Sequence, residues 1–290
     1  MNYYIFDKND EILNRHDKNA VNVLSLFDGG YCIGMLNEHT NENVGFCYLS
    51  MAPDTDIMQL DRLDIADEYR SEENECSIIE AAERFAKSRG AKGLRIKYEL
   101  PEDYGEDMSG LRLRDAAELL SYGFSGEKEY LEFTLESLLK GRLIRGVLST
   151  PDKFPDVFLL QEHENEALIE LEKICLEKGI AFSAADFDEE LTVFCSSDGN
   201  RPDGVCCCRP HADGILYIDD AYLEKEGDTD PIRLSLLAAV ILQLSQYYLT
   251  DTRVRISLSD AGLRNRSLPM LGEMSRYVTE GYLEKHTIYS

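Results

Sequence analysis

The sequence predicts an α/β protein built from two tandem copies of one domain, each a mixed central sheet flanked by helices. Three observations support this. Short segments recur in the same order at an offset of about 150 residues, both copies show the same succession of strand and helix patterns, and 290 residues with 43% hydrophobic content can form two cores. The duplication has the size of a domain, so it is not the short period of a solenoid.

Four pairs of segments establish the repeat. Two pairs lie near the end of each copy at an offset of 152, and two lie upstream at offsets of 158 and 159. They are Leu111–Arg114 with Leu263–Arg266, Tyr130–Glu132 with Tyr282–Glu284, Ser77–Ile79 with Ser235–Leu237, and Gly45–Cys47 with Gly204–Cys206. Small insertions explain the drift of the offset, and the shared order argues against chance similarity.

The boundary between the copies is predicted at residues 149–155. This linker separates a first domain at 1–148 from a second domain at 156–290. It contains Pro151 and Pro155, and the residue before each proline is biased away from helix.

The first copy is expected to begin with a hairpin and then to alternate strands with helices. Alternation of apolar and polar residues predicts the strands, and a period of 3.6 predicts the helices. In chain order the elements are strands at Tyr31–Leu36, Val44–Leu49 and Met58–Ile65, a helix at Glu72–Arg89, a strand at Leu94–Tyr98, a helix at Arg114–Ser121 and a strand at Tyr130–Leu135. Ser71 is expected to cap the long helix, because its hydroxyl can accept from a free N–H of the first turn.

The second copy repeats this order behind an additional front end. Its elements are a strand at Val157–Leu160, a helix at Glu164–Glu177, strands at Leu191–Ser196, Gly204–Arg209 and Ile215–Ala221, a helix at Asp230–Leu249, a strand at Arg253–Leu258, a helix from Asn265 and a strand at Gly281–Ile288. Pro231 suits the first position of the long helix, which is apolar almost all round and is therefore expected to be deeply buried. Residues 1–30 show no comparable front helix, so we expect the first copy to be truncated at its N-terminus.

The net charge of −25 is spread over both halves. Residues 1–145 carry 17 basic and 29 acidic residues, and residues 146–290 carry 13 and 26. Such a surface repels nucleic acid and anionic membranes and attracts amines, polyamines and basic peptides. It also opposes a polyanion such as coenzyme A unless basic residues gather locally. The alternative is that the acids serve solubility alone.

The cysteines and the N-terminus indicate a reducing cytoplasm. No signal-peptide pattern follows Met1, and no apolar run is long enough to span a membrane. None of the eight cysteines has C-x-x-C or zinc-site spacing, so no metal site is expected. The run Cys206–Cys208 fits a core strand, whose middle residue points to the opposite face from its neighbours. A metal or redox role for this run is the alternative.

The order strand, strand, strand, helix, strand, helix, strand resembles the core of the GNAT superfamily, the acetyl-CoA-dependent N-acetyltransferases. The resemblance covers nearly the whole chain, once per half. It implies that acetyl-CoA or another acyl-CoA binds where the strand before the long helix ends, in a loop of the type Arg/Gln-x-x-Gly-x-Gly/Ala. In such a loop the glycines let the backbone approach the pyrophosphate, and the helix N-terminus offers free N–H groups.

The cofactor loop of the first half departs from this pattern. Arg70 fits its first position, but Glu73 and Glu75 occupy the two glycine positions. At roughly 5–6 Å and an effective dielectric constant of about 20, each carboxylate–phosphate contact would cost about 3 kcal/mol. The alternative is that these acids stabilise the start of their own helix. The cofactor contacts that the resemblance implies here are Leu63, Ile65, Arg70 and Ser71.

The cofactor loop of the second half retains one glycine, Gly227, flanked by acids. Pro231 removes one N–H donor from the following helix. This loop is also poor for a phosphate, though less plainly blocked than the first. The cofactor contacts implied here are Ile218, Gly227 and Thr229.

The family often uses a tyrosine on the last helix to protonate the departing thiolate, four residues before the glycine of a closing Gly-Phe pair. The first half has the pair Gly123–Phe124, so this position holds Leu119, and by the repeat it holds Leu271 in the second half. Neither leucine can donate a proton. Tyr122 is the remaining candidate, with the alternative that it packs as an amphipathic core residue.

A general base would be a carboxylate near the central strands. Asp61 and Asp64 are available in the first half, and Asp219 and Asp220 in the second. We take Asp64 and Asp219 as the candidate catalytic bases. Acids are so frequent in this chain that a solvated surface charge is the alternative for each.

Two functions follow from these expectations. The first is an N-acyltransferase that moves an acetyl or acyl group from acyl-CoA to a small amine or basic peptide. The alternative is a catalytically inactive tandem GNAT-like module with a binding or structural role. The altered cofactor loops support this alternative. In either case we expect no nucleic-acid or membrane partner.

Overall fold

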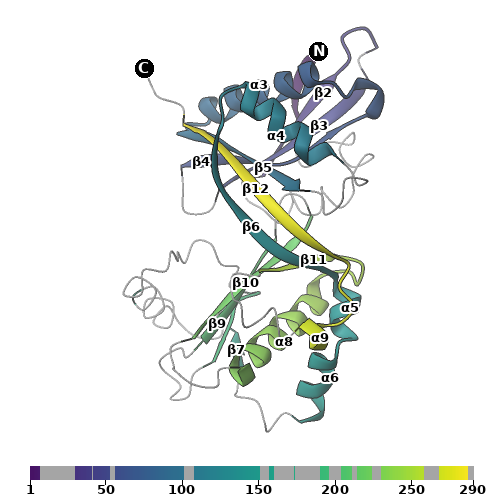
Figure 1. The fold of residues 1–290 in the computed structure, drawn as a ribbon, viewed down its shortest axis with the longest axis vertical. Helices are drawn as coiled ribbons and strands as arrows, with labels where there is room; N and C mark the ends of the chain where they lie inside the picture. Colours follow the sequence, from purple (N-terminus) through teal and green to yellow (C-terminus); the bar gives the residue numbers. More distant parts are fainter. Residues whose placement is uncertain are drawn as a thin grey trace. The chain divides into compact units, whose positions relative to one another are not determined.

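The computed structural model describes residues 1–6, 30–40, 42–52, 56–100, 108–150, 157–159, 173, 190–195, 204–210, 214–223, 230–257 and 268–286. The chain forms two α/β units (Figure 1). Unit 1 comprises Met1–Lys128, His211–Gly214 and Val278–Ser290, and unit 2 comprises Glu129–Pro210 and Ile215–Tyr277. The predicted linker at 149–155 lies within the range of unit 2, and the boundary between the sequence repeats stays a prediction.

Unit 1 contains a mixed sheet whose first strands follow chain order. The order is β1 (Asn2–Phe6), β2 (Tyr31–Leu36), β3 (Asn43–Met51), β4 (Ile57–Ile65), β5 (Gly93–Leu100) and β12 (Arg276–His286). Neighbours are antiparallel except β4 and β5, which are parallel. The predicted hairpin and the two strands after it are confirmed.

Two helices cover one face of this sheet, α3 (Glu72–Ser88) and α4 (Ser109–Leu119). Residues of both helices share one buried cluster with the strands, including Ile78, Phe85 and Ala116. The predicted cap of α3 is confirmed, because the Ser71 hydroxyl accepts from the backbone N–H of Asn74 at 3.3 Å. The helix thus begins at the predicted residue and presents its apolar stripe to the sheet.

Unit 2 has a corresponding sheet. Its order is β6 (Gly123–Thr134), β11 (Arg253–Ser257), β10 (Leu216–Leu223), β9 (Gly204–Pro210), β8 (Val193–Cys195) and β7 (Val157–Leu159). The long helix α8 (Asp230–Tyr247) packs on β7 to β10. Six of its residues are buried in the core, as its apolar composition predicts: Leu236, Leu237, Ala238, Val240, Ile241 and Leu244.

Each sheet is completed by a strand from the other sequence repeat. β12, from the end of the chain, pairs antiparallel with β5 of unit 1, and the second part of β6 pairs with β11 of unit 2. Accordingly, Leu283 is buried in the core of unit 1 and Leu131 in the core of unit 2. These leucines are the middle residues of the repeated Tyr-Leu-Glu segments. One of the four segment pairs that reveal the repeat therefore lies in the exchanged strands.

An ion pair accompanies each exchanged strand. In unit 1, Glu284 of β12 lies opposite Arg95 of β5 and accepts from its guanidinium at 2.9 and 3.0 Å. In unit 2, Glu132 of β6 lies opposite Arg255 of β11 and accepts from it at 2.8 Å. A direct cross-strand pair of opposite charges favours this register over a slipped one.

Four helices of the described chain differ from the prediction. α4 begins at Ser109, five residues before the expected start at Arg114. The sequence reading assigned no helix to α5 (Leu135–Leu139) or α6 (Arg142–Ser149), and α9 spans only Leu268–Leu271. α5 and α6 are too short for periodicity to identify, but they bury Leu138, Leu143 and Ile144 against α8. The helix expected at 164–177 and the trimmed front end expected within residues 7–29 lie outside the described residues, apart from the single helical residue Lys173.

The cysteine run behaves as a strand. Cys206 and Cys208 of β9 are in the core of unit 2, whereas Cys207 is buried outside that cluster. This alternation confirms the predicted strand. Among the described residues, no helix combines the length and apolarity that a membrane crossing requires.

Candidate functional site

The two parallel strands of unit 1 separate part of the way along their length. β4 and β5 pair from Ile57 and Gly93 as far as Leu60 and Ile96. β4 then continues to Ile65 and β5 to Leu100 without further pairing between them. Beyond the last pair, the backbone N–H and C=O groups of the two strands no longer bond to each other and can bond to a ligand instead. We therefore take this divergence as the centre of the candidate site.

A β-bulge marks the point of divergence. Across β3 and β4 the register runs from Leu49 opposite Leu60 to Tyr48 opposite Arg62, so Asp61 is the extra residue. Its carboxylate is buried and accepts from the Ser50 hydroxyl and from the Gln59 side-chain amide, both at 2.6 Å. Asp61 therefore occupies a fixed position next to the last parallel pair.

Unit 2 repeats this arrangement. β10 and β11 pair in parallel from Leu216 to Ile218, whose partner is Ile256, and β10 continues to Leu223. The register between β9 and β10 shifts between Asp219 and Tyr222, directly after the last parallel pair. Ile218 corresponds to Leu60 at the upstream repeat offset of 158. Both copies thus share an end of parallel pairing that is followed by an irregularity in the neighbouring antiparallel register.

The predicted cofactor loop of unit 1 is closed by its own contacts. The 3-10 helix η1 (Asp67–Tyr69) precedes α3, and the Asn74 side-chain amide donates to the Tyr69 carbonyl at 2.6 Å. Arg70 donates to the Ile65 carbonyl at 3.0 Å and lies 3.5 Å from the Asp67 carboxylate. The guanidinium expected to meet a phosphate is therefore engaged within the loop.

The acids of this loop lie at the helix start, as the sequence predicts. Glu73 is exposed, whereas Glu75 is buried on the first turn of α3. Burial raises the pKa of Glu75, and the charges of Arg112 and Arg70 oppose that rise. Both carboxylates therefore lie in the first turn of α3, where the sequence places them.

The other residues predicted in unit 1 are dispersed. Leu63 and Ile65 pack against the core of the unit, with Ile65 buried. Asp64 is half-exposed and pairs with Arg62 at 2.8 Å, as a surface ion pair does. The carboxylate at the divergence is Asp61 instead, and the β-bulge that places it there has no signal in the hydrophobic pattern.

Tyr122 is buried against the middle of α3. Its hydroxyl donates to Glu83 at 3.3 Å, and Lys285 lies over its ring and pairs with Glu83 at 3.0 Å. Burial, with the nearby Glu83 carboxylate, raises the pKa of Tyr122 far above its ordinary value. Glu83 lies eleven residues into the helix, about 16 Å from its start at a rise of 1.5 Å per residue. This placement favours the packing role.

The leucines at the expected tyrosine position differ in environment. Leu119 at the end of α4 is 61% exposed, whereas Leu271 at the end of α9 is 1% exposed. Phe124, the second residue of the closing Gly-Phe pair, is exposed. Neither Leu119 nor Phe124 carries a proton donor.

The residues predicted in unit 2 are only partly described. Ile218 is buried at the last parallel pair, and Asp219 and Asp220 lie in β10 at the register shift. Gly227 and Thr229 lie outside the described residues. Ile218 and both aspartates, which are consecutive in sequence, therefore lie where the parallel pairing of β10 ends.

Sequence reasoning missed a buried charge cluster beside this point. Arg255, fully buried, donates to Glu132 at 2.8 Å and to the Tyr217 hydroxyl at 2.9 Å. Arg276 donates to the same carboxylate at 3.1 Å. Arg255 and Tyr217 are partners in the β10–β11 register, one residue before the last parallel pair. The glutamate of this cluster belongs to the repeated Tyr-Leu-Glu segment and was visible in the sequence. Only the strand pairing shows that its partner is Arg255.

The described residues contain no cluster of histidine, cysteine and carboxylate groups that could hold a metal ion.

Neither a protein-family model nor a curated protein sequence matches the chain. Solved structures do match it. A tandem GNAT protein from the clavulanic acid biosynthesis pathway aligns with 100% of this chain and 99% of its own length, at a TM-score of 0.63 and 9% identity. The GCN5-related glucosamine N-acetyltransferase region of a fungal multi-domain GH3 β-N-acetylglucosaminidase aligns with 97% of this chain and 38% of that chain, at 0.55 and 12%.

A GCN5-related N-acetyltransferase from Kribbella flavida aligns with 84% of this chain and 88% of its own, at a TM-score of 0.51 and 12% identity. At such identities structural similarity reports on the fold and not on the substrate. The diverging parallel strands, the helix after the first of them and the duplication agree with these matches. The chain therefore has the fold of the GNAT superfamily, in two tandem copies.

Proposed function

We propose that the protein is an N-acyltransferase that moves an acetyl or acyl group from acyl-CoA to a small amine or basic peptide. One observation carries the proposal. In a GNAT fold that spans the whole chain, both copies keep the divergence of their parallel strands with an acid at the break, Asp61 in unit 1 and Asp219 in unit 2.

Unit 2 is the proposed site of reaction. The loop of unit 1 is closed by contacts of Arg70 and Asn74 and carries buried and exposed carboxylates. In unit 2 the loop retains Gly227, and Thr229 adds a hydroxyl that can donate to a phosphate. Ile218 would line the acyl-CoA arm at the divergence. The first sequence repeat then supplies the strand that completes the unit 2 sheet, rather than a second site.

The activated acyl group comes with the thioester when acyl-CoA is bound. Asp219 would take a proton from the substrate ammonium, so that the neutral amine can attack the thioester carbonyl. Strand N–H groups freed by the divergence would stabilise the oxyanion. Since Leu119 and Leu271 cannot donate, the departing thiolate would take its proton from water or from the carboxyl group of Asp219.

The substrate class follows from charge. The chain has a net charge of −25, and its surface favours the approach of a cationic amine over that of an anion. Salt should therefore raise the Michaelis constant for the amine, because it screens this attraction.

Calorimetric titration with acetyl-CoA tests the proposal. We expect one site per chain with micromolar affinity, lost in Gly227→Glu, which adds a carboxylate and a side chain to the proposed pyrophosphate loop. Ser245→Glu is the matched control, because it adds the same charge at an exposed position on α8. Asp219→Asn should keep binding and lose turnover. No heat at millimolar acetyl-CoA would exclude the proposal.

The inactive tandem module is the second candidate. The support for it is confined to the copy in unit 1, where Arg70 and Asn74 make hydrogen bonds within the loop. It would hold for the whole chain if wild-type protein bound no acyl-CoA and acetylated no member of an amine panel.

A further inference from the structure

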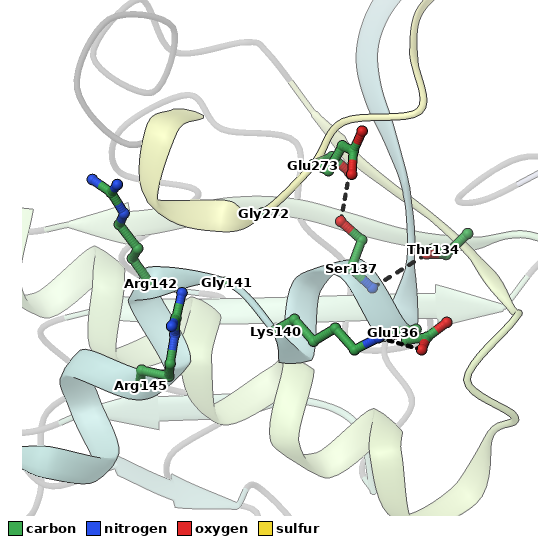
Figure 2. Close-up of a pocket in the computed structure, with 9 residues that line it drawn as sticks. All are labelled: Thr134, Glu136, Ser137, Lys140, Gly141, Arg142, Arg145, Gly272 and Glu273. Carbon is green, nitrogen blue, oxygen red and sulfur yellow. Dashed lines mark hydrogen bonds and ion pairs between the residues drawn. The ribbon is translucent and has the colours of Figure 1, made fainter.

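We propose that unit 2 carries a second ligand site, a hollow at the corner between α5 and α6 that binds a small phosphate-bearing anion. The hollow has a volume of about 490 Å³ and lies between this corner and the segment that follows α9 (Figure 2). That volume is within the range of small-molecule sites. None of its lining residues belongs to β10, β11 or α8, so it is separate from the proposed acyl-transfer site.

Two backbone segments approach each other closely at the base of the hollow. A Cβ at Gly141 would lie 2.4 Å from the Leu271 carbonyl oxygen, and a Cβ at Gly272 would lie 2.3 Å from the Ser137 carbonyl oxygen. The Ser137 hydroxyl donates to the Glu273 carbonyl at 2.5 Å. Only glycine permits both approaches, and Gly272 also has a φ of +127°. The hollow is therefore preformed, which lowers the entropic cost of binding.

Two arginines supply the positive charge of the hollow. Arg142 and Arg145 are exposed, lie three residues apart on α6 and have no ion-pair partner among the residues that the structure describes. Figure 2 shows both on one side of the hollow, away from Glu136 and Glu273. Lys140, by contrast, pairs with Glu136 at 2.5 Å. In a chain with a net charge of −25, two neighbouring arginines on one helix, without an ion-pair partner among the described residues, form a local exception to the surface field.

The first turn of α6 lines the hollow and has no side-chain cap. α6 begins at Arg142 after Gly141, which offers no side-chain cap, so the first N–H groups of the helix have no acceptor from a cap. Guanidinium groups bind phosphate oxygens through paired hydrogen bonds, and free N–H groups add further donors. Leu143 and Ile144 are buried in the core and hold α6 in place.

The two sides of the hollow set the chemistry of the ligand. The arginine side suits a phosphate or pyrophosphate group. The side with Glu136 and Glu273 repels a further anion but accepts a neutral or cationic group. The ligand is therefore a compact molecule with its phosphate at one end, not a long polyanion.

Titration with inorganic pyrophosphate at constant ionic strength, followed by calorimetry and by ³¹P line broadening, tests the site on the full chain. We expect saturable binding of one pyrophosphate that is weakened tenfold or more in the double variant Arg142→Ala/Arg145→Ala. The control Arg84→Ala/Lys87→Ala removes the same two charges from exposed positions on α3 and should bind as wild type does.

Four results would overturn the proposal. One is the absence of saturable binding by wild type, and another is equal weakening in the control variant. The third is citrate binding as tightly as pyrophosphate, which would show a general charge effect rather than phosphate recognition. Saturating acetyl-CoA should leave the pyrophosphate affinity unchanged, and displacement would mean that no second site exists. A failure of acetyl-CoA binding alone would count against the proposed acyltransferase and not against this site.

Discussion

Glu132 shows how much of this fold depends on single charged residues. Its carboxylate is 4% exposed and accepts from Arg255 and Arg276, while Arg253 lies 3.9 Å away. Arg255 is itself fully buried. A buried charge is tolerated only when it has a partner. The main effect of the Glu132 carboxylate is therefore to compensate the buried charge of Arg255, rather than to add stability of its own.

Glu132→Gln should therefore lower the free energy of unfolding by about 3 kcal/mol, since it removes the charge that pairs with the fully buried Arg255 guanidinium at 2.8 Å. Urea denaturation at pH 7 measures this. Glu136→Gln is the matched control, because its pair with Lys140 is solvent-exposed and its loss should change little. Equal effects of the two substitutions would contradict the prediction.

The same residue predicts a pH dependence. Burial alone would raise the pKa of Glu132, but the hydrogen bond from Arg276 and the charges of Arg255, Arg276 and Arg253 outweigh it and lower that pKa. A lowered pKa in the folded state contributes stability above the ordinary value of about 4.3, and this contribution is lost as the pH falls toward the folded pKa.

The stability difference between wild type and Glu132→Gln should accordingly shrink as the pH falls from 6 to 3. Urea midpoints measured at half-unit intervals test it. A difference that stays constant through this window would show that the carboxylate does not titrate in the way its contacts require.

At the scale of elements, β12 matters most for the stability of unit 1, because it contributes to the core of that unit. Leu283 is 2% exposed in the core of unit 1, and Gly281 makes room for the ring of Tyr98, whose Cζ would lie 2.3 Å from a Cβ at 281. A strand from the far end of the chain thus supplies side chains that the core of unit 1 needs.

Leu283→Ala should destabilise the protein by 2–5 kcal/mol, because it removes a buried side chain and leaves a cavity. Thermal unfolding measures the loss. Leu119→Ala removes the same atoms from a side chain that is 61% exposed and should shift the midpoint little. If Leu283→Ala unfolded at the wild-type midpoint, β12 would not belong to this core.

Element prediction succeeded where local signals are strong. The hairpin, α3 with its Ser71 cap and the strand at Cys206–Cys208 follow from alternation, period and capping, all of which act over a few residues. α5 and α6 were missed because one or two turns give too little periodicity. The lengthening of β6 to Gly123 was missed because its first residues are exposed and lack an apolar face.

At the scale of the whole molecule, each unit contains strand residues from both sequence repeats. Cutting the chain at the predicted linker would therefore not release two complete domains. Fragment 1–150 would lack β12, and fragment 151–290 would lack the part of β6 that pairs with β11.

We expect each fragment alone to show no cooperative unfolding, and an equimolar mixture to recover it at the expense of the free fragments. Circular dichroism melts of the fragments and of their mixture test this, with sedimentation to show the complex. Cooperative folding of fragment 1–150 alone would mean that the exchange is not required.

The sequence by itself determined the duplication, the α/β class, most element positions and the acidic surface, because each of these is written in local pattern or composition. The tertiary structure decided which strands are neighbours, which aspartate lies at the divergence of β4 and β5, and where positive charge gathers. Pairing between residues more than one hundred positions apart leaves no periodic signal. A one-residue bulge such as that at Asp61 moves a side chain to another place without changing the hydrophobic pattern around it.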